Sequence, residues 1–265
     1  MSFKKTEAIV IKTLNLREAD KIVTFFSRDY GKIQGIARGA RKIRAKQGGN
    51  FELFTRLNVI FFQKADVMPS DTQGGEHALL KITQADMLEA FPAIHADFNK
   101  LIGASYIAEC LNRAFEPHDQ SHQAVYALTC GALRALAAAQ HIRPLIPAFE
   151  IKLIAHLGYA PVLHRCTVCQ TPRAAVELPR FSFATGGLLC SRCAAARKEA
   201  VEVSNEAIDA LSALLRTDMA HVETLPLPPE LHQEIKHLLT NYMQYHLGIA
   251  LKTDMFVQKL RAANR

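Results

Sequence analysis

The sequence lacks the features that mark several common protein classes. No apolar run approaches the roughly 20 residues that a helix needs to span a bilayer, and Met1–Lys5 lead into a strand-like segment rather than a signal peptide. A Walker-type phosphate loop, a Gly-x-Gly-x-x-Gly motif after a strand and a Gly-x-Ser-x-Gly elbow are also missing. We therefore expect a cytoplasmic protein, and nothing in the sequence argues for an enzyme.

One stretch, Tyr30–Lys46, contains no acidic residue, and six of the fifteen residues from Lys32 onward are Lys or Arg. Residues 1–50 carry 12 basic and 4 acidic side chains, a net charge of +8, against +7 for the whole chain. Charge concentrated in this way attracts polyanions, whereas the same charge scattered over the surface would mostly serve solubility. The stretch is therefore predicted to bind phosphate groups.

The alternative interpretation of this stretch is a solvated basic arm without structure. Three isoleucines, Ile33, Ile36 and Ile43, are interleaved with the charges, and glycines punctuate them. Unstructured arms are poor in such β-branched residues. The pattern favours a strand followed by a loop.

Residues 1–80 show the pattern of a small β-rich unit. Residues 6–13 and 22–26 form β-branched or aromatic runs, Asp29–Gly31 is predicted as a turn, and apolar residues alternate from Phe51 to Phe61. A fifth strand is predicted over His77–Thr83.

Five short strands in this length suggest a closed barrel such as an OB-fold. In such barrels one sheet face and its loops bind single-stranded nucleic acid, with basic side chains following phosphates and aromatic rings stacking on bases. Tyr30, Phe51 and Phe54 are candidates for stacking, although such residues are more often part of the core.

Helical spacing of apolar residues replaces this pattern from about Pro92. Helices are predicted around 98–107, 125–136 and 145–156. The first two contain Cys110 and Cys130, which we interpret as buried and inert thiols.

The C-terminal part of the sequence returns to helical spacing. Ser204 is a predicted N-cap, and a further helix is predicted to begin after Pro228–Pro229 and to end at Gly248.

Between these helical parts, Cys166-x-x-Cys169 is followed after twenty residues by Cys190-x-x-Cys193. This spacing is typical of a tetrahedral site in which four thiolates hold Zn²⁺. Gly186–Gly187 is predicted as the turn of a connecting hairpin, which would complete a zinc ribbon. Four thiolates fill the coordination shell, so the predicted zinc is structural.

The cysteines allow three other interpretations. Two redox-active Cys-x-x-Cys motifs or a pair of disulfides would use the same residues, although a cytosolic protein rarely keeps disulfides. A zinc deaminase would need His-x-Glu upstream of Pro-Cys-x-x-Cys. The His-x-Glu segments His221–Glu223 and His232–Glu234 both lie downstream, and neither pair follows a proline.

These patterns predict an α+β multidomain chain. An N-terminal OB-fold barrel over residues 1–80 would be followed by an α-helical domain over 81–160 and 201–265, with a Cys₄ zinc ribbon inserted over 161–200.

The sequence resembles the RecO family of bacterial recombination mediators. The similarity is close at Leu16–Val23, at Tyr30–Lys42, and at Gly186–Cys190 with Cys193, and it extends over nearly the whole chain. Some members of that family lack the zinc cysteines, whereas this chain has all four.

The resemblance implies a protein of DNA repair and recombination that responds to DNA damage without hydrolysing nucleotides. It implies binding of single- and double-stranded DNA, annealing of complementary strands, and loading of the recombinase RecA onto coated strands. It also implies RecR, RecF and the acidic tail of single-stranded DNA-binding protein as partners, and a location at the nucleoid.

Strand annealing requires two polyanions to be held together, and clustered Lys and Arg reduce their repulsion and release counterions. The predicted phosphate contacts are Arg38, Arg41, Lys42, Arg44 and Lys46. Weaker candidates on neighbouring elements are Arg17, Lys21 and Lys32.

Two other classes share these features. A zinc-ribbon RNA-binding or transcription-associated factor would have the same basic β unit and the same cysteines, and would prefer RNA over DNA. A structural scaffold that docks proteins through its helices would have no affinity for nucleic acid at moderate salt.

Overall fold

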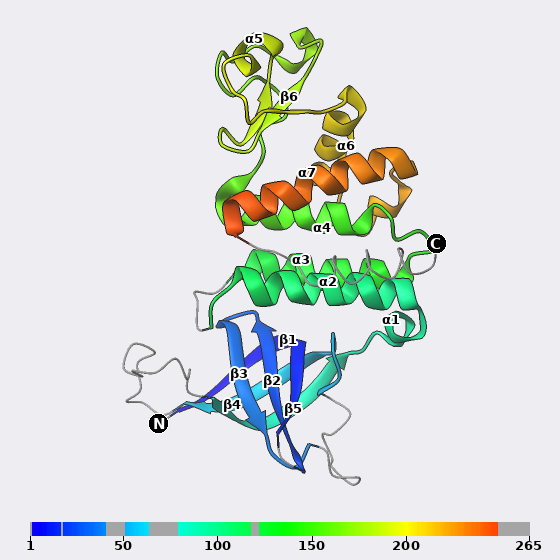
Figure 1. The fold of residues 1–265 in the computed structure, drawn as a ribbon. Coiled ribbons are helices and arrows are strands. Elements are labelled where there is room, and N and C mark those ends of the chain that lie inside the picture. The colour runs from blue at the N-terminus through cyan, green and yellow to red at the C-terminus, as the bar shows by residue number, and fades with distance from the viewer. Residues whose placement is uncertain (1, 17, 41–50, 64–78, 118–121, 249–265) are drawn as a thin grey trace. The chain divides into compact units, whose positions relative to one another are not determined.

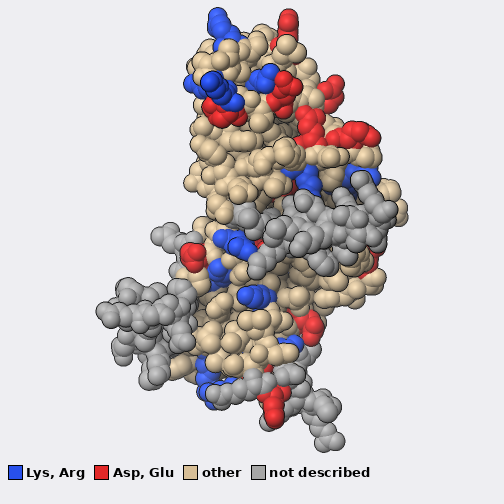
Figure 2. Space-filling view, in the orientation of Figure 1, with Lys and Arg blue, Asp and Glu red and all other residues tan. Residues whose placement is uncertain are grey.

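The computed structural model describes residues 2–16, 18–40, 51–63, 79–117 and 122–248. These residues form two compact units, one up to Ala127 and the other from Leu128 onward. Figure 1 shows the strands of the first unit and the helices and small sheet of the second. On the face drawn in Figure 2, Lys and Arg side chains lie over the barrel unit and over the small sheet of the second unit, and several Asp and Glu side chains lie over helix α6 (Asn205–Arg216).

Five strands of the first unit close into a barrel in the order β1-β2-β3-β5-β4, and β4 pairs back with β1. The pair β3–β5 is parallel and the other pairs are antiparallel. This OB-type barrel confirms the predicted fold of the N-terminal part. Its strands are β1 (Ser2–Leu16), β2 (Asp20–Ser27), β3 (Gly31–Ala37), β4 (Arg56–Gln63) and β5 (Leu80–Glu89).

The barrel forms because its strands alternate apolar and polar residues. Leu57, Val59 and Phe61 of β4 are at most 1% exposed and point into the core, while the residues between them point outward. The predicted turn between β2 and β3 is confirmed, since the chain reverses through residues 28–30 and Gly31 has φ 59°, a conformation that favours glycine.

The strand predicted to begin at Phe51 begins only at Arg56. Phe51 is buried in the barrel core and Phe54 is buried beside His95 of the following helix, but both precede β4, and Phe54 has φ 70°. The Phe54 N–H donates to the Val10 carbonyl at 2.8 Å, and the Val10 N–H donates to the Thr55 carbonyl at 3.0 Å. Burial does not alternate through the turn that precedes β4, since Phe54 and Thr55 are both buried and Leu53 is only partly buried. A bulge in β1 at this point binds the turn instead of a strand.

The fifth strand is longer than predicted. It runs to Glu89 instead of Thr83, because Lys81 to Glu89 pair with the whole length of β4. The start of the predicted strand at His77 lies outside the described residues.

Two helices follow the barrel within the first unit, α1 (Pro92–Ala96) and α2 (Phe98–Ala114). Asp97 caps α2 by accepting a hydrogen bond from the Lys100 N–H at 3.0 Å. Outward-facing residues of the barrel are buried on this side: Phe26 of β2 stacks on Phe115 with ring centroids 4.9 Å apart. The helix thus covers part of the outer surface of β1, and Phe115, directly after the helix, packs against β2.

The remaining helices are α3 (Gln123–Ala138), α4 (Leu145–Ile154), α5 (Ser191–Ala194), α6 and α7 (Pro229–Leu247). The predicted caps are confirmed: the Ser204 hydroxyl accepts from the Ala207 N–H at 3.0 Å, and Gly248 ends α7 with φ 63°. Within the described residues, no helix combines the length and the apolar character that crossing a membrane requires.

A three-stranded sheet of the order β7-β6-β8 belongs to the second unit. It contains β6 (Arg180–Ser182), β7 (Gly187–Leu189) and β8 (Val201–Glu202). Gly186 has φ 69° in the turn between β6 and β7, which confirms the predicted hairpin.

Replacing Gly35 with alanine should destabilise the barrel. A Cβ on Gly35 would lie 2.8 Å from Cγ1 of Ile82 and 3.0 Å from the Leu80 carbonyl oxygen, at the β3–β5 contact that closes the barrel. We expect Gly35→Ala to cost about 1–3 kcal/mol, measured by urea unfolding with circular dichroism, because the chain has no tryptophan.

The matched control is Gly131→Ala in α3. Its Cβ would lie at an ordinary distance of 3.6 Å from the Cβ of Met219, so the same measurement should show a neutral effect or a gain of up to about 1 kcal/mol. Equal effects of the two substitutions would contradict the packing argument.

Candidate metal centre and nucleic-acid interface

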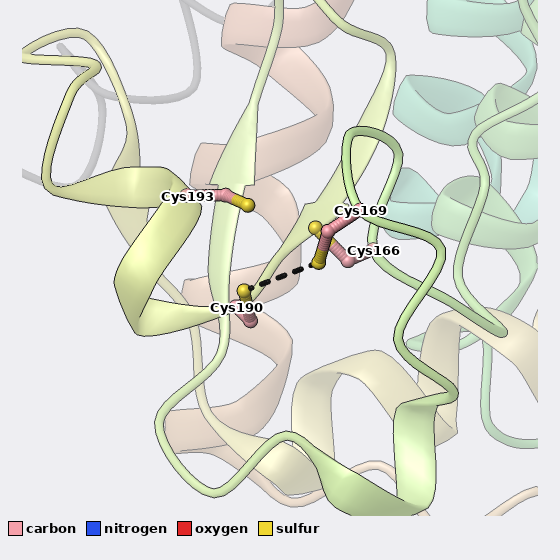
Figure 3. Close-up of side chains that lie close together, drawn as sticks. All are labelled: Cys166, Cys169, Cys190 and Cys193. Atoms are coloured by element: carbon pink, nitrogen blue, oxygen red, sulfur yellow. Dashed lines mark hydrogen bonds between the residues drawn. The ribbon is translucent and has the colours of Figure 1, made fainter.

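The four cysteines of the two Cys-x-x-Cys pairs converge on one point. Their sulfur atoms all lie within 4.8 Å of one another. Cys166 and Cys169 come from a loop, Cys190 follows β7, and Cys193 lies on α5, as Figure 3 shows. The sequence spacing thus predicted which residues would come together.

Local hydrogen bonds shape the first pair. The Gln170 N–H donates to the Cys166 carbonyl at 3.0 Å, and the Cys166 N–H donates to the Thr171 carbonyl at 2.8 Å. Gln170 has φ 62°, a left-handed conformation that tightens the turn. The turn presents both sulfur atoms on the same side.

Backbone contacts hold the loop against the hairpin. The Thr167 N–H donates to the Leu188 carbonyl at 2.8 Å, and the Leu188 N–H donates to the Val162 carbonyl at 2.9 Å. A Cβ on Gly187 would collide with the Val162 backbone, so this close approach requires glycine. The two cysteine pairs are thereby fixed relative to each other.

The residues present fit a divalent metal ion. Zinc binds thiolate at about 2.3 Å in a tetrahedron, which puts the sulfur atoms about 3.8 Å apart. The Cys169 and Cys190 sulfur atoms are 3.6 Å apart. Cys166 is fully buried and the other three are partly covered. The structure supports a metal site of four thiols, and the assignment of zinc to it remains a prediction.

The pKa shifts of the clustered thiols also favour a bound cation. A hydrogen bond with the Thr171 hydroxyl, at 3.0 Å from the sulfur, lowers the pKa of Cys169 to about 5. The hydrogen bond that Cys193 makes with Cys169 raises the pKa of Cys193 to about 12. Without a cation the crowded thiols share protons instead of all ionising, and a bound divalent cation removes that repulsion.

Thr171 was not singled out from the sequence. Its hydroxyl holds the Cys169 sulfur, and its carbonyl accepts from the Cys166 N–H. A residue with a hydroxyl two positions after a Cys-x-x-Cys pair is the signal that could have identified it.

The ribbon is joined to α7 by aromatic rings within the second unit. Phe181 of β6 packs edge-on against Tyr242 with centroids 5.3 Å apart. The Tyr242 hydroxyl donates to the Tyr159 carbonyl at 3.1 Å, and a ring nitrogen of His246 lies 3.0 Å from the Phe183 carbonyl. The small sheet therefore shares a core with a long helix.

At the barrel, the structure describes only the start of the predicted phosphate-binding loop. Arg38 is exposed in the turn after β3. The next residue, Gly39, donates its N–H to the Asp20 carboxylate at 2.8 Å, and Ala40 is 7% exposed in the barrel core. Arg38 is thus presented from an anchored turn. Arg17, Arg41, Lys42, Arg44 and Lys46 lie outside the described residues.

Lys32 occupies a position that argues against the predicted phosphate contact. Its side chain is buried, with 6% of the residue exposed, and its Nζ donates to the Asn112 carbonyl at 2.7 Å. Burial lowers the pKa of Lys32 below its usual value. The side chain connects the barrel with α2.

The other weak candidate, Lys21, is partly covered. Its ammonium group lies 3.5 Å from the Glu52 carboxylate, and 17% of its side chain is exposed. Its charge is therefore already compensated in part by a neighbouring carboxylate.

The candidate stacking residues also differ in accessibility. Phe51 and Phe54 are at most 2% exposed, so they belong to the core. Tyr30 is partly buried, packs edge-on against Phe61, and has the Lys4 ammonium group 4.9 Å from its ring centroid. Tyr30 alone of the three reaches the surface.

Comparison with known proteins finds two family models along the chain. The model described as "Recombination protein O N terminal" matches residues 1–74, and the model described as "Recombination protein O C terminal" matches residues 95–255.

Similar full-length relatives are found among curated proteins. The chain is 32% identical over 263 residues to a protein named DNA repair protein RecO from Pelotomaculum thermopropionicum, covering 99% of this chain and 96% of that protein. It is 31% identical over 261 residues to a protein of the same name from Caldanaerobacter subterraneus, covering 98% and 99%. A third of that name, from Symbiobacterium thermophilum, is 30% identical, covering 99% and 100%.

Purified protein should contain about one zinc ion per chain, and Cys169→Ser should lose it. Elemental analysis by mass spectrometry after dialysis against a weak chelator measures this. Loss of the metal should also speed hydrogen exchange at the Thr167 amide, which holds the loop to the hairpin. Cys130→Ala, which alters a thiol outside the cluster, should keep the metal. A metal-free wild-type protein, or a Cys169→Ser variant that retains zinc, would contradict the assignment.

Lys32→Met should lower stability without changing how the protein binds DNA. The substitution keeps a long apolar side chain but leaves the Asn112 carbonyl without its donor, at an expected cost of about 1–3 kcal/mol. Chemical unfolding measures the cost, and a salt series of DNA binding measures the second effect. A salt dependence weakened as much as in Arg38→Ala would show that Lys32 contacts phosphate after all.

Proposed function

The chain belongs to the recombination protein O family, and on that basis we propose that it is a DNA-binding mediator of recombination in DNA repair that is not itself an enzyme. In this proposal the barrel binds single- and double-stranded DNA, and the protein anneals complementary strands. The single observation that carries the proposal is an OB-type barrel whose anchored turn at Arg38 leads into the basic stretch.

The barrel supports binding through its charge distribution. The first 50 residues hold a net charge of +8, more than the whole chain. The anchored turn presents one cation of this segment, Arg38, at the surface. Contacts to phosphates do not depend on base sequence, so the proposed binding is independent of sequence and sensitive to salt.

Annealing follows from the same physics. Two complementary strands repel each other, and a basic surface that neutralises phosphates on both lowers that repulsion and releases counterions. Base pairing then supplies the free energy of the product. No nucleotide hydrolysis is required in this mechanism.

Family membership also supports a set of partners. We propose that the chain works with RecR, binds the acidic tail of single-stranded DNA-binding protein, and, together with RecF, helps load RecA onto coated strands in the cytoplasm at the nucleoid. An acidic, apolar tail requires an apolar groove with a basic rim.

The proposed role of zinc is structural. The Cys₄ cluster would hold Zn²⁺ through Cys166, Cys169, Cys190 and Cys193, which fixes a hairpin too small to have a full core of its own. The division into a barrel domain over 1–80, a helical domain made of 81–160 and 201–265, and a zinc ribbon over 161–200 remains a proposal.

The triple substitution Arg41→Ala, Lys42→Ala, Arg44→Ala should weaken DNA binding for every sequence. Each lost contact to single-stranded DNA reduces the slope of log K against log salt by about 0.7, so the slope should fall by about 2. Fluorescence anisotropy with labelled single strands of different sequence, over a salt series, measures both effects.

The matched control removes three exposed cations from the second unit, Arg165→Ala, Lys198→Ala and Arg216→Ala. This variant loses the same net charge as the barrel triple. If the barrel is the contact surface, the slope of log K against log salt should nevertheless change little, because these three cations are not on the barrel. Unchanged affinity and slope in the barrel triple would refute the proposed interface.

A comparison of DNA with RNA of the same sequence tests the class of function. Tight, salt-sensitive DNA binding with annealing in the absence of ATP is the expected result. A strong preference for RNA would favour a zinc-ribbon RNA-binding or transcription-associated factor, and no binding even at low salt would favour a scaffold.

A further inference from the structure

A pocket of about 290 Å³ opens on the second unit beside helix α6. Its walls come from α6, from the segment that leads into α7, and from the first turn of α7. Seven of its nine lining residues are apolar and two carry carboxylates. The carboxylates belong to Glu206 and Asp209, and the apolar lining includes Ala213, Leu225 and Leu227.

The far wall of the pocket is held in place by hydrogen bonds. The backbone N–H groups of Gln140 and His141 both donate to a carboxylate oxygen of Glu223 at 2.7 Å. The Leu225 N–H donates to the Val222 carbonyl at 3.0 Å, and the Arg143 guanidinium donates to the Leu227 carbonyl at 3.3 Å. The pocket is therefore formed before any ligand binds.

The size of the pocket limits what it can hold. Pockets for drug-sized ligands have volumes of about 300–1,000 Å³, so this one is at the lower limit. A single large apolar side chain, of the kind that anchors a protein–protein contact, suits a small apolar pocket of this sort. The occupant is thus a side chain presented by a peptide segment rather than a free metabolite.

The charge of the side chains at the edge of the pocket determines which charge a bound partner should carry. Glu206 and Asp209 lie one turn apart on α6, and Figure 2 shows Asp and Glu gathered over this helix. The Asp209 side chain is 75% exposed and lies a long 3.8 Å from Arg173, whose guanidinium donates to Asn205 at 2.7 Å. The Asp209 carboxylate can therefore pair with an incoming cation.

We propose that this pocket binds a basic peptide segment of a partner protein. A large apolar side chain enters between Ala213 and Leu227, and flanking Lys or Arg side chains pair with Glu206 and Asp209. DNA and acidic peptides are repelled by the same carboxylates. The pocket would therefore bind a different kind of ligand from the basic surfaces that are proposed to bind DNA and an acidic tail. The inference about the pocket does not depend on the proposed function.

A fluorescein-labelled peptide of sequence GKRLFKRG tests the proposal with the full-length protein. Two matched peptides separate its components: GEDLFEDG reverses the charges and GKRSSKRG removes the apolar side chains. The wild-type protein should bind the first peptide about tenfold more tightly than either of the others at low salt.

Two variants locate the binding. Ala213→Leu fills the pocket on a partly exposed helical position and should weaken binding about tenfold. Glu206→Gln with Asp209→Asn removes both rim charges and should weaken it about threefold to fivefold, less so at high salt.

The control Glu177→Gln with Glu199→Gln removes the same charge from exposed positions of the ribbon and should leave affinity unchanged. Circular dichroism should show all three variants to be folded, since none alters a buried residue. The proposal is overturned if the three peptides bind alike, if none binds, or if Ala213→Leu and the rim variant keep the affinity of the wild type.

Discussion

The parallel pairing of β3 with β5 is the constraint on which the first unit depends. This short contact closes the barrel, and it leaves no room for a side chain on Gly35 beside Ile82. Closure fixes where β3 leaves the barrel at Ala37, and from there the Asp20 carboxylate and the burial of Ala40 fix the next turn. The basic stretch therefore starts from a defined point on the surface. In this account the geometry of a sheet contact positions the surface that meets DNA.

The chain also has three clusters of groups that carry, or can carry, charges of the same sign. Each cluster would be stabilised by a ligand of the opposite charge. The basic stretch has no acidic residue to neutralise it, and in the proposed function polyanionic phosphates supply the missing charge. The four thiols of the ribbon lie within 4.8 Å of one another, and a bound divalent cation would supply their counter-charge. The carboxylates of α6, with the opposite sign, are proposed to pair with a basic partner. The three surfaces are thus proposed to bind chemically different ligands.

Much of the structure could be predicted from local signals. The N-cap at Ser204, the C-terminal glycine at 248 and the convergence of four cysteines follow from residue type and spacing alone. The strand predicted from Phe51 is wrong at its start for a physical reason: the apolar residues there are buried in a turn, in which the Phe54 backbone bonds to a bulged part of β1 that is distant in sequence. The burial of Lys32 could not be foreseen, because its acceptor, the Asn112 carbonyl, is 80 residues away in sequence. Local patterns describe which side chains are buried, but a long-range contact decides how a particular lysine is used.

The most direct test of the central claim is photo-cross-linking of single-stranded DNA that contains 5-iodouracil, followed by mass spectrometry of the linked peptides. Unlike a binding assay, this measurement reports which part of the chain touches the bases. The account predicts links to peptides that contain Tyr30 or the turn at Arg38, with few in the zinc ribbon. Links confined to residues 128–248 would contradict the account, because DNA would then lie on the second unit and not on the barrel.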